Sequence, residues 1–506
     1  MKTINRSIFP LLVLLQITCL STNSWAQDSC ADAQLVNGLD IQISCLVLGN
    51  DVRSVRLNNV DPVGLTWNFT GQVDTPNCTA EAARCTSVSA DQSLVINRID
   101  IAGESHKVEL APAPELGQYH WRYRSHTKLQ DAPTSPALDA AALEQVRLFM
   151  QKVVDTELQV PGAVLGIAQG NSIVFMEAFG SRDVASGQKL TIENLLHIGS
   201  TNKSITSFLI AALVDDGVLG WDTRAIDIYP GFATSDTAAS ATITIRQLLD
   251  MTSGLPRDAN INTDEPARAL LDRLNQQTII AAPGTTYQYS NLSSSLAAYL
   301  AVLANVKATK GQITDSDLDN LHAGYTDLLK TKVLTPIGMN NSTLSATSAL
   351  GTNLLSKSHE RVNGNFTVSE SIDTDPDNLA PAGGLKSTVS DMLGFVITDM
   401  QQGISPTGVR VVSAANVSAR QKLSPGPASN MDYGLSIDVV TLNNGVDYIG
   451  HSGSFDNFNS VMGFFPAKQL AFVLLTNGDS PEAGQLTGTQ QNSLIERLSQ
   501  LVNTAP

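Results

Sequence analysis

The sequence is poor in the residues that build metal centres and that bind polyanions. Cysteine occurs five times, always within the first 85 positions, and the seven histidines are scattered. Neither a C-x-x-C pair nor an H-E-x-x-H run occurs, so we expect no metal and no cofactor. Basic residues number 32 against 48 acidic ones, which gives a formal charge of −16. An acidic surface argues against nucleic acid and anionic membranes as partners.

Long apolar runs near the N-terminus are also missing. The run Ile8–Leu15 is too short to span a bilayer. It follows Lys2 and Arg6 and precedes the small residues of Ser24–Ala26, a pattern typical of an export signal. We therefore expect a signal peptide at 1–26, with the rest of the chain exported to the periplasm or the extracellular space and no membrane span left. A retained anchor is the alternative. Loss of Lys2 and Arg6 would make the formal charge −18.

Four cysteines would remain after that cut: Cys30, Cys45, Cys78 and Cys85. An even number, clustered in an exported chain, predicts two disulfides. Three pairings are possible, and short loops favour Cys30–Cys45 and Cys78–Cys85. A zinc site is the rival hypothesis, but no histidine of suitable spacing accompanies them.

Residues 27–130 contain many short segments of alternating polarity between turn residues, such as those at 40–48 and 94–101. They predict a small, disulfide-stapled β domain of accessory function. Its Trp67 and Trp121 suit a carbohydrate or cell-wall binding face, although burial in a core is the favoured interpretation. The run D-A-P-T-S-P at 131–136 is typical of a linker.

Residues 137–506 show a different pattern. A helix is expected at 137–158, followed by strands at 163–169 and 172–180 that are joined by a Gly-Asn turn. Further strands are expected at 433–440, 447–453, 460–466 and 470–477, before a closing helix at 493–502. Helical segments fill the middle. This order predicts an α+β fold, in which strands from both ends form one antiparallel sheet flanked by helices, with a helical subdomain beside it.

The stretch His197–Gly217 combines a serine and a lysine with a long apolar helix. Ser200 and Lys203 lie one turn apart at the start of that helix. A serine becomes a nucleophile when a base takes its proton, and burial at a helix N-terminus favours the neutral lysine that such a base requires. The alternative is an N-cap serine and a solvated lysine. S-x-x-K also occurs at Ser125–Lys128 and Ser186–Lys189, but neither copy opens such a helix.

Two further motifs follow later in the chain. Tyr289-Ser290-Asn291 combines a proton-carrying phenol with an amide that can hold a substrate carbonyl. The alternative is a turn before a helix, with Asn291 as the cap of that helix. In His451-Ser452-Gly453, a small residue lets substrate lie along a strand, and the next amide, of Ser454, can face an oxyanion. H-x-G recurs at His197 and His322, and G-H-S-G-S fails as a G-x-S-x-G elbow because Ser454 replaces glycine.

In this order, the three motifs together resemble the serine β-lactamase and penicillin-binding protein superfamily, on the branch of class C β-lactamases, D,D-carboxypeptidases and esterases. The segments at 243–256, 334–339 and 380–392 are similar to recurrent family segments. The resemblance covers residues 137–506 and implies a serine hydrolase that works through an acyl-enzyme.

Transferred residue by residue, the resemblance assigns Ser200 as nucleophile, Lys203 as its base, Tyr289 as proton relay, and Asn291 and Gly453 as substrate-binding residues. The backbone N–H groups of Ser200 and Ser454 would form the oxyanion hole. His451 would stand where β-lactamases carry a lysine.

This last departure bears on the substrate, because histidine is mostly neutral at pH 7. We expect a peptidase, amidase or esterase that acts on a small-molecule or peptide-like acyl substrate. A true β-lactamase and a non-catalytic penicillin- or cell-wall-binding protein are the alternatives. Val306–Asn320 resembles an insertion, and we expect it to form a loop at the edge of the cleft.

Overall fold

The computed structural model divides the chain into two compact units, Met1–Ala132 and Pro133–Pro506, which are described separately. In the second unit it describes residues 138–155, 160–257, 262, 265–369, 377–423, 432–478 and 493–504. In the first unit it describes the backbone of the strands. In the part of the chain so described, no helix is both long enough and apolar enough to cross a membrane.

The first unit contains antiparallel strands. Its larger ones are β3 (Asp40–Leu48), β4 (Asp51–Val60), β5 (Thr66–Gly71), β9 (Leu94–Ile101), β10 (Glu104–Pro112) and β11 (His120–Lys128). Shorter ones are β1 (Leu14–Gln16), β2 (Ala33–Gln34), β6 (Val73–Asp74), β7 (Cys78–Thr79) and β8 (Arg84–Cys85). They form sheets of order β1-β11-β10-β9-β6, β2-β3-β4-β5 and β7-β8. β1 lies inside the segment predicted to be an export signal.

The predicted disulfides fall in this unit. Cys78 and Cys85 are direct partners across the β7–β8 ladder, and Cys45 lies in β3. Cys30 lies outside the described residues. Both pairings remain predictions.

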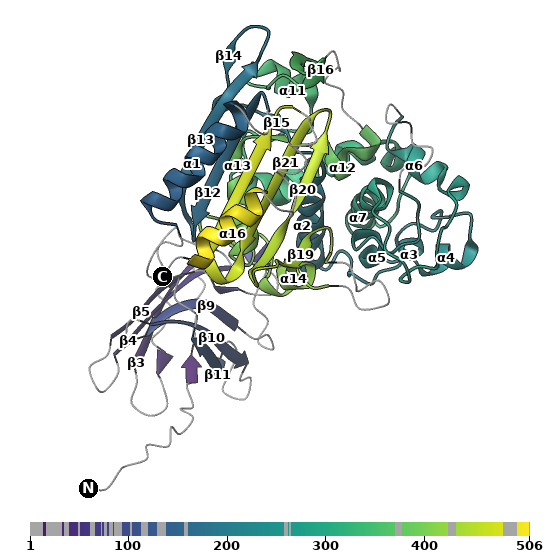
Figure 1. The fold of residues 1–506 in the computed structure, drawn as a ribbon. Coiled ribbons are helices and arrows are strands. Elements are labelled where there is room, and N and C mark those ends of the chain that lie inside the picture. Colours follow the sequence, from purple (N-terminus) through teal and green to yellow (C-terminus); the bar gives the residue numbers. More distant parts are fainter. Residues whose placement is uncertain are drawn as a thin grey trace. The chain divides into compact units, whose positions relative to one another are not determined.

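The second unit is built on a seven-stranded sheet assembled from both ends of the unit (Figure 1). Its strands, in spatial order, are β14 (Gln188–Lys189), β13 (Ser172–Asp183), β12 (Gly162–Gln169), β22 (Leu470–Thr476), β21 (Phe458–Phe465), β20 (Asp447–Phe455) and β19 (Asp438–Thr441). All neighbours are antiparallel. Two-stranded ladders pair β15 (Leu196–His197) with β18 (Lys386–Ser387) and β16 (His359–Val362) with β17 (Asn365–Val368).

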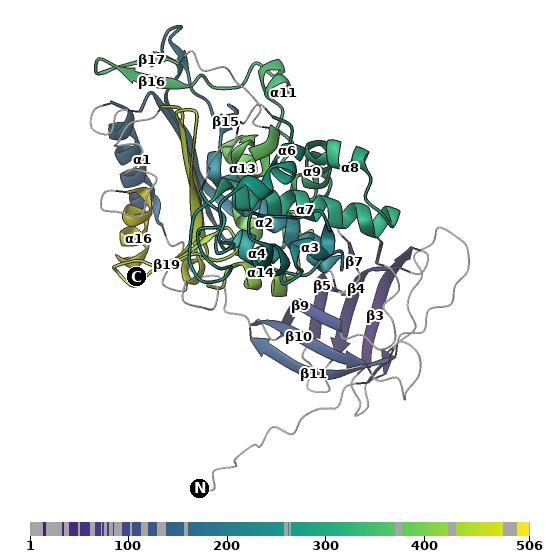
Figure 2. The same ribbon diagram turned by 90° about the vertical axis from the view of Figure 1, so that its right-hand side faces the viewer.

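Helices cover both faces of this sheet (Figure 2). α1 (Ala140–Asp155) and α16 (Leu494–Thr504) cover one face, and α2 (Asn202–Asp215) and α13 (Val389–Met400) cover the other. The alternation of β12 explains how one strand serves both layers: Leu165 and Ile167 pack toward α1 and α16, whereas Val164 packs into the other core. This antiparallel sheet between helices confirms the predicted α+β class.

Short helices and one long helix make up the predicted helical middle. They are α3 (Ala225–Ile228), α4 (Thr237–Thr242), α5 (Ile245–Leu249), α6 (Arg268–Asp272), α7 (Asn291–Lys310), α8 (Asp315–Asp319), α9 (Leu321–Leu329), α10 (Thr335–Ile337) and α11 (Ala346–Gly351). α12 (Ala380–Gly383) and α14 (Ala414–Arg420) follow.

The expected loop at Val306–Asn320 is wrong. α7 continues to Lys310 and ends at Gly311, whose φ of 81° is the left-handed value that a helix C-terminus favours. α8 then begins with a capping box, in which Thr314 and Asp317 bond each other's backbone, and Lys310 pairs with Asp317 at 2.6 Å. The segment therefore adds helix rather than loop.

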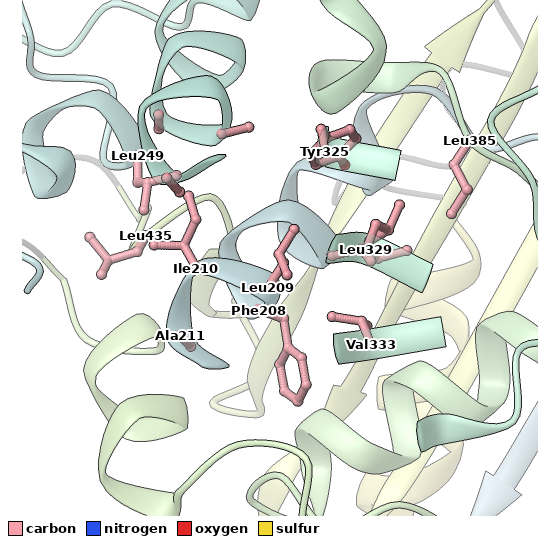
Figure 3. Packing of buried hydrophobic residues seen from close by; sticks show 14 of the residues in the cluster. Phe208, Leu209, Ile210, Ala211, Leu249, Tyr325, Leu329, Val333, Leu385 and Leu435 are labelled. Atoms are coloured by element: carbon pink, nitrogen blue, oxygen red, sulfur yellow. The ribbon is translucent and has the colours of Figure 1, made fainter. Parts of the chain in front are cut away.

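α2 lies in the centre of the larger core, and its residues Asn202 to Leu213 are all buried. Figure 3 shows its apolar side chains, Phe208 to Ala211, among residues of other segments that include Leu249, Tyr325 and Leu435. Phe208 meets Phe395 of α13 edge to face, with ring centroids 5.4 Å apart. Gly217, with φ of 70°, follows the helix end as predicted. Packing on all sides therefore holds this helix in one position.

Candidate active site

Ser200 and Lys203 meet at the start of α2. Ser200 lies in a 3₁₀ turn, η2 (Gly199–Thr201), directly before the helix, and it is half-buried. Lys203 is fully buried, and its Nζ donates a hydrogen bond to Ser200 Oγ at 2.9 Å. The structure therefore places an amine behind an accessible hydroxyl.

The alternative of a capping serine and a solvated lysine is wrong. Thr201 is the N-cap residue of α2 and makes no side-chain capping bond. Lys203 has no exposed surface. In the S-x-x-K copy at Ser186–Lys189, by contrast, both the serine and the lysine are exposed to solvent.

The backbone of α12 holds the first turn of α2. Three carbonyls accept bonds, from Asn202 Nδ2 to Ala380 O (2.8 Å), from Thr206 Oγ1 to Pro381 O (2.7 Å) and from Lys203 Nζ to Ala382 O (2.8 Å). The bond to Ala382 orients the amine of Lys203 beside the serine. Residues 380–392 are similar to a recurrent family segment, but the sequence alone indicated no role of α12 in the site.

Tyr289 completes this group from the segment before α7. Lys203 Nζ lies 4.9 Å from the centroid of its ring, and the phenol is close enough to Ser200 for the serine to influence its pKa. Burial raises the pKa of Tyr289, and the serine opposes that rise. Tyr289 is therefore a neutral phenol at physiological pH, able to donate and accept a proton.

Asn291 is the first residue of α7 and is half-buried. It does not cap the helix, because Ser290 does so: Ser293 N donates to Ser290 Oγ at 3.1 Å. Ser290 Oγ in turn donates to Pro256 O at 2.8 Å. The capping role considered for Asn291 thus belongs to its neighbour.

β20 brings the third motif against η2. A Cβ added at Gly453 would lie 2.3 Å from Ile198 O and 2.8 Å from Ser200 N, so only glycine fits there. Gly199, with φ of 52°, packs equally closely on Ser454, because a Cβ on it would lie 2.7 Å from Ser454 N. These contacts bring the backbone amides of Ser200 and Ser454 into one small region.

The open edge of β20 lies at the same place. β19 pairs with β20 from Asp447 to Gly450, whereas His451 to Phe455 pair with β21. Among the described residues no strand pairs with this part of β20 on its other edge. The backbone groups on that edge of β20 are therefore not used in a strand ladder among the described residues.

His451 is buried at the point where the β19 ladder ends. Its Nε2 lies 2.9 Å from Tyr433 Oη, and its Nδ1 bonds to Ser452 O. Burial, and then the nearby charge of Lys203, lower the pKa of His451 to about 3, against the opposing effect of the Ser452 bond. The imidazole is therefore neutral at physiological pH.

The other copies of the short motifs lie elsewhere. His197 is buried and stacks on Phe455, with ring centroids 4.8 Å apart, and His322 lies on α9. Ser125 and Lys128 lie in β11 of the first unit. The position of each copy in the fold, rather than its sequence pattern, therefore distinguishes the copies.

Comparison with known proteins relates the second unit to one protein family. The family model described as Beta-lactamase matches residues 146–494. Penicillin-binding protein 4 of Amycolatopsis lactamdurans is 26% identical over 64% of this chain and 82% of its own length. Protein flp of Staphylococcus aureus strain N315 is 24% identical over 65% of this chain. The match covers 63% of the length of that relative.

Solved structures share the fold. A penicillin-binding protein homologue from Pyrococcus abyssi, described as octameric, has a TM-score of 0.53 at 20% identity, over 68% of this chain and 74% of its own. D-amino acid amidase from Ochrobactrum anthropi SV3 has a TM-score of 0.54 at 18% identity, over 71% of this chain and 99% of its own.

Proposed function

The chain belongs to the β-lactamase family, and from this membership and the geometry of its site we propose that it is a serine hydrolase that cleaves an amide or ester through an acyl-enzyme. The observation that carries the proposal is the distance of 2.9 Å between Lys203 Nζ and Ser200 Oγ, with the lysine fully buried. A serine needs such a base to become a nucleophile.

In the proposed acylation, Ser200 Oγ bonds to the carbonyl carbon of the substrate and its proton passes to the neutral amine of Lys203. The proton then reaches the leaving nitrogen or oxygen through Tyr289, whose phenol contacts Ser200. The carbon–heteroatom bond breaks and the acyl group stays on Ser200. Water, activated by the same groups, then hydrolyses the ester.

The negative oxygen that forms in each step needs donors. The amides of Ser200 and Ser454 are the proposed pair, supported by the close contact of Gly199 and Gly453 with the opposite segment. Asn291 and the open edge of β20 are proposed to hold the rest of the substrate.

The neutral state of His451 supports a preference among substrates. A family member with lysine at this place has a fixed positive charge for a substrate carboxylate, which a neutral imidazole lacks. We therefore propose a peptidase, amidase or esterase rather than a true β-lactamase.

A fluorophosphonate probe tests the reaction class, since it forms a covalent bond only with an activated serine. We expect labelling of the wild-type protein at Ser200 and no labelling of Ser200→Ala. No adduct, or an adduct that survives Ser200→Ala, contradicts the proposal and favours a non-catalytic binding protein.

A panel of p-nitrophenyl esters, D-alanyl peptides and nitrocefin then tests the substrate class. Turnover of esters or peptides with little nitrocefin hydrolysis is expected. The reverse order would favour the β-lactamase alternative.

Export is part of the proposal. Protein recovered outside the cytoplasm is expected to begin after Ala26. Retention of residues 1–26 would contradict it. Residues 27–130 are proposed to bind carbohydrate or cell wall through Trp67 and Trp121. Retention of the full chain on insoluble cell wall tests this role.

A further inference from the structure

One buried tyrosine contacts two of the three motifs. Tyr433 is 6% exposed and precedes β19, and its ring meets those of Tyr289 and His451 edge to face, at centroid distances of 6.4 and 5.7 Å. It also meets Tyr287 at 5.6 Å. Tyr433 thus lies between the helical part of the site and the sheet.

The hydrogen bonds of His451 determine which ring nitrogen carries the proton. Ser452 O can only accept, so the bonded Nδ1 must carry a hydrogen. In the neutral ring Nε2 is then an acceptor, and the hydroxyl of Tyr433 donates to it at 2.9 Å. Protonation of Nε2 would require this hydroxyl to turn and accept instead.

We propose that Tyr433 is a positioning residue for the hydrolysis proposed above: its hydroxyl holds His451 as the neutral Nδ1–H tautomer, and its ring holds Tyr289 against Ser200. The inference rests on the proposed function for its effect on the rate. The assignment of the His451 tautomer does not depend on that function.

The charges around His451 explain why its state matters. Lys203 faces it from α2 and Tyr289 from the segment before α7, whereas Asp438 of β19 pairs with the neighbouring residue, Gly450. An imidazolium here would lie near Lys203, and like charges disfavour each other. The neutral ring held by Tyr433 keeps a cation away from Lys203, which itself becomes charged when it accepts the proton of Ser200. A substrate carbonyl then meets a neutral surface along β20.

Tyr433→Phe removes one oxygen and keeps the ring. Without the donor, Nε2 is easier to protonate, so the acid limb of the kcat/KM profile is expected to move up by about one pH unit, a tenfold change in proton affinity. Tyr448→Phe is the matched control. Tyr448 is buried like Tyr433, but it lies on β20 and its hydroxyl donates to Met462 O at 3.0 Å instead of to a histidine. The control is expected to keep the wild-type profile.

Nitrogen-15 NMR of labelled histidine gives a readout that needs no turnover. Comparison with His451→Gln assigns the signals, and wild type is expected to show a neutral ring protonated at Nδ1 at pH 7. In Tyr433→Phe the Nε2 signal is expected to move. An Nε2–H tautomer or a charged ring in the wild type overturns the inference, even if Tyr433→Phe does not fold. An unchanged profile and spectrum in a folded Tyr433→Phe also overturn it. Absence of fluorophosphonate labelling in wild type would contradict only the proposed function.

Discussion

Arg420 and Asp399 form an ion pair with no exposed surface on the arginine and 2% on the aspartate, at an N–O distance of 2.7 Å. The same guanidinium donates to Ser204 O at 2.9 Å and to Ser207 Oγ at 3.1 Å, both on α2. The pair therefore connects α13 and α14 to the helix that carries Lys203.

Asp399→Asn removes one charge and leaves the other buried. We expect it to lower the free energy of unfolding by about 3–5 kcal/mol, since an uncompensated buried charge is strongly destabilising. Urea denaturation measures this. Asp227→Asn is the control, because its pair with Arg224 is about half exposed on both sides and its loss is expected to leave the midpoint unchanged. Equal effects of the two substitutions would contradict the structural role of the buried pair.

Lys203→Arg separates charge from basicity. Arginine keeps a positive charge but cannot lose its proton in a protein, so it cannot accept the proton of Ser200. The rate of fluorophosphonate labelling is expected to fall by about 10²–10⁴-fold, the usual contribution of a general base. Lys189→Arg, in the exposed copy of the motif, is expected to label at the wild-type rate. Wild-type labelling of Lys203→Arg would exclude the lysine as base.

Asp438, which is half-buried, is expected to make the stability depend on pH. Burial, with repulsion from Asp432 added, raises the pKa of Asp438 to about 7. An aspartate in the unfolded chain titrates near 3.9, so between these values the folded protein holds a proton that the unfolded chain releases. This contribution is complete below about pH 4 and is lost as the pH rises through 7.

Asp438→Asn removes the ionisation with little change of shape. The melting temperature of this variant is expected to exceed that of wild type at pH 8 and to match it at pH 4. Differential scanning calorimetry at both pH values checks this, and an equal difference at both would contradict the pKa shift.

Gly453→Ala places a methyl group against Ile198 O and Ser200 N. Because one of the two must move, the proposed oxyanion hole is displaced, and kcat/KM is expected to fall by about 10²–10³-fold, as for loss of one oxyanion donor. Gly351→Ala is the control, since a Cβ there meets nothing within 4 Å. Kinetics alongside melting curves show whether the loss exceeds any unfolding. Wild-type turnover by Gly453→Ala would exclude this geometry.

Cys78 and Cys85 are opposite each other in an antiparallel ladder, a spacing that a disulfide can span. Peptide mapping without reductant is expected to recover them linked. Free thiols at both positions, or a link from Cys78 to another cysteine, would contradict the predicted pairing.

The sequence predicted the features that depend on local spacing. Ser200 and Lys203 lie within one turn, so helical periodicity alone brought them together, and Gly217 ended the helix as expected. Most strands at both ends of the second unit were also predictable, because their apolar patterns are strong, but the strand expected at 433–440 begins only at Asp438. The chemical interpretation of Ser200 needed two more motifs.

Contacts through space were not predictable. In the sequence, Tyr433 was only the first residue of an expected strand. Its hydrogen bond to His451 depends on how β19 pairs with β20. The bond from Lys203 to Ala382 uses a backbone carbonyl, and the identity of the alanine side chain gives no indication of it. The loop expected at Val306–Asn320 is different, since the sequence itself contains the capping residues Thr314 and Asp317 that mark the start of α8.

The pairing of β12 with β22 has a consequence for how the protein is made. Ala163 is a partner of Thr476, so this ladder joins segments from opposite ends of the unit. A ribosome must have released the chain through β22 before these strands can meet, and such distant pairing slows folding. β20 is connected to β12 through the same late ladder, because β21 joins it to β22. Ser200 therefore acquires the proposed oxyanion hole only after β22 has been made, and a shorter nascent chain would carry the proposed nucleophile without the activity.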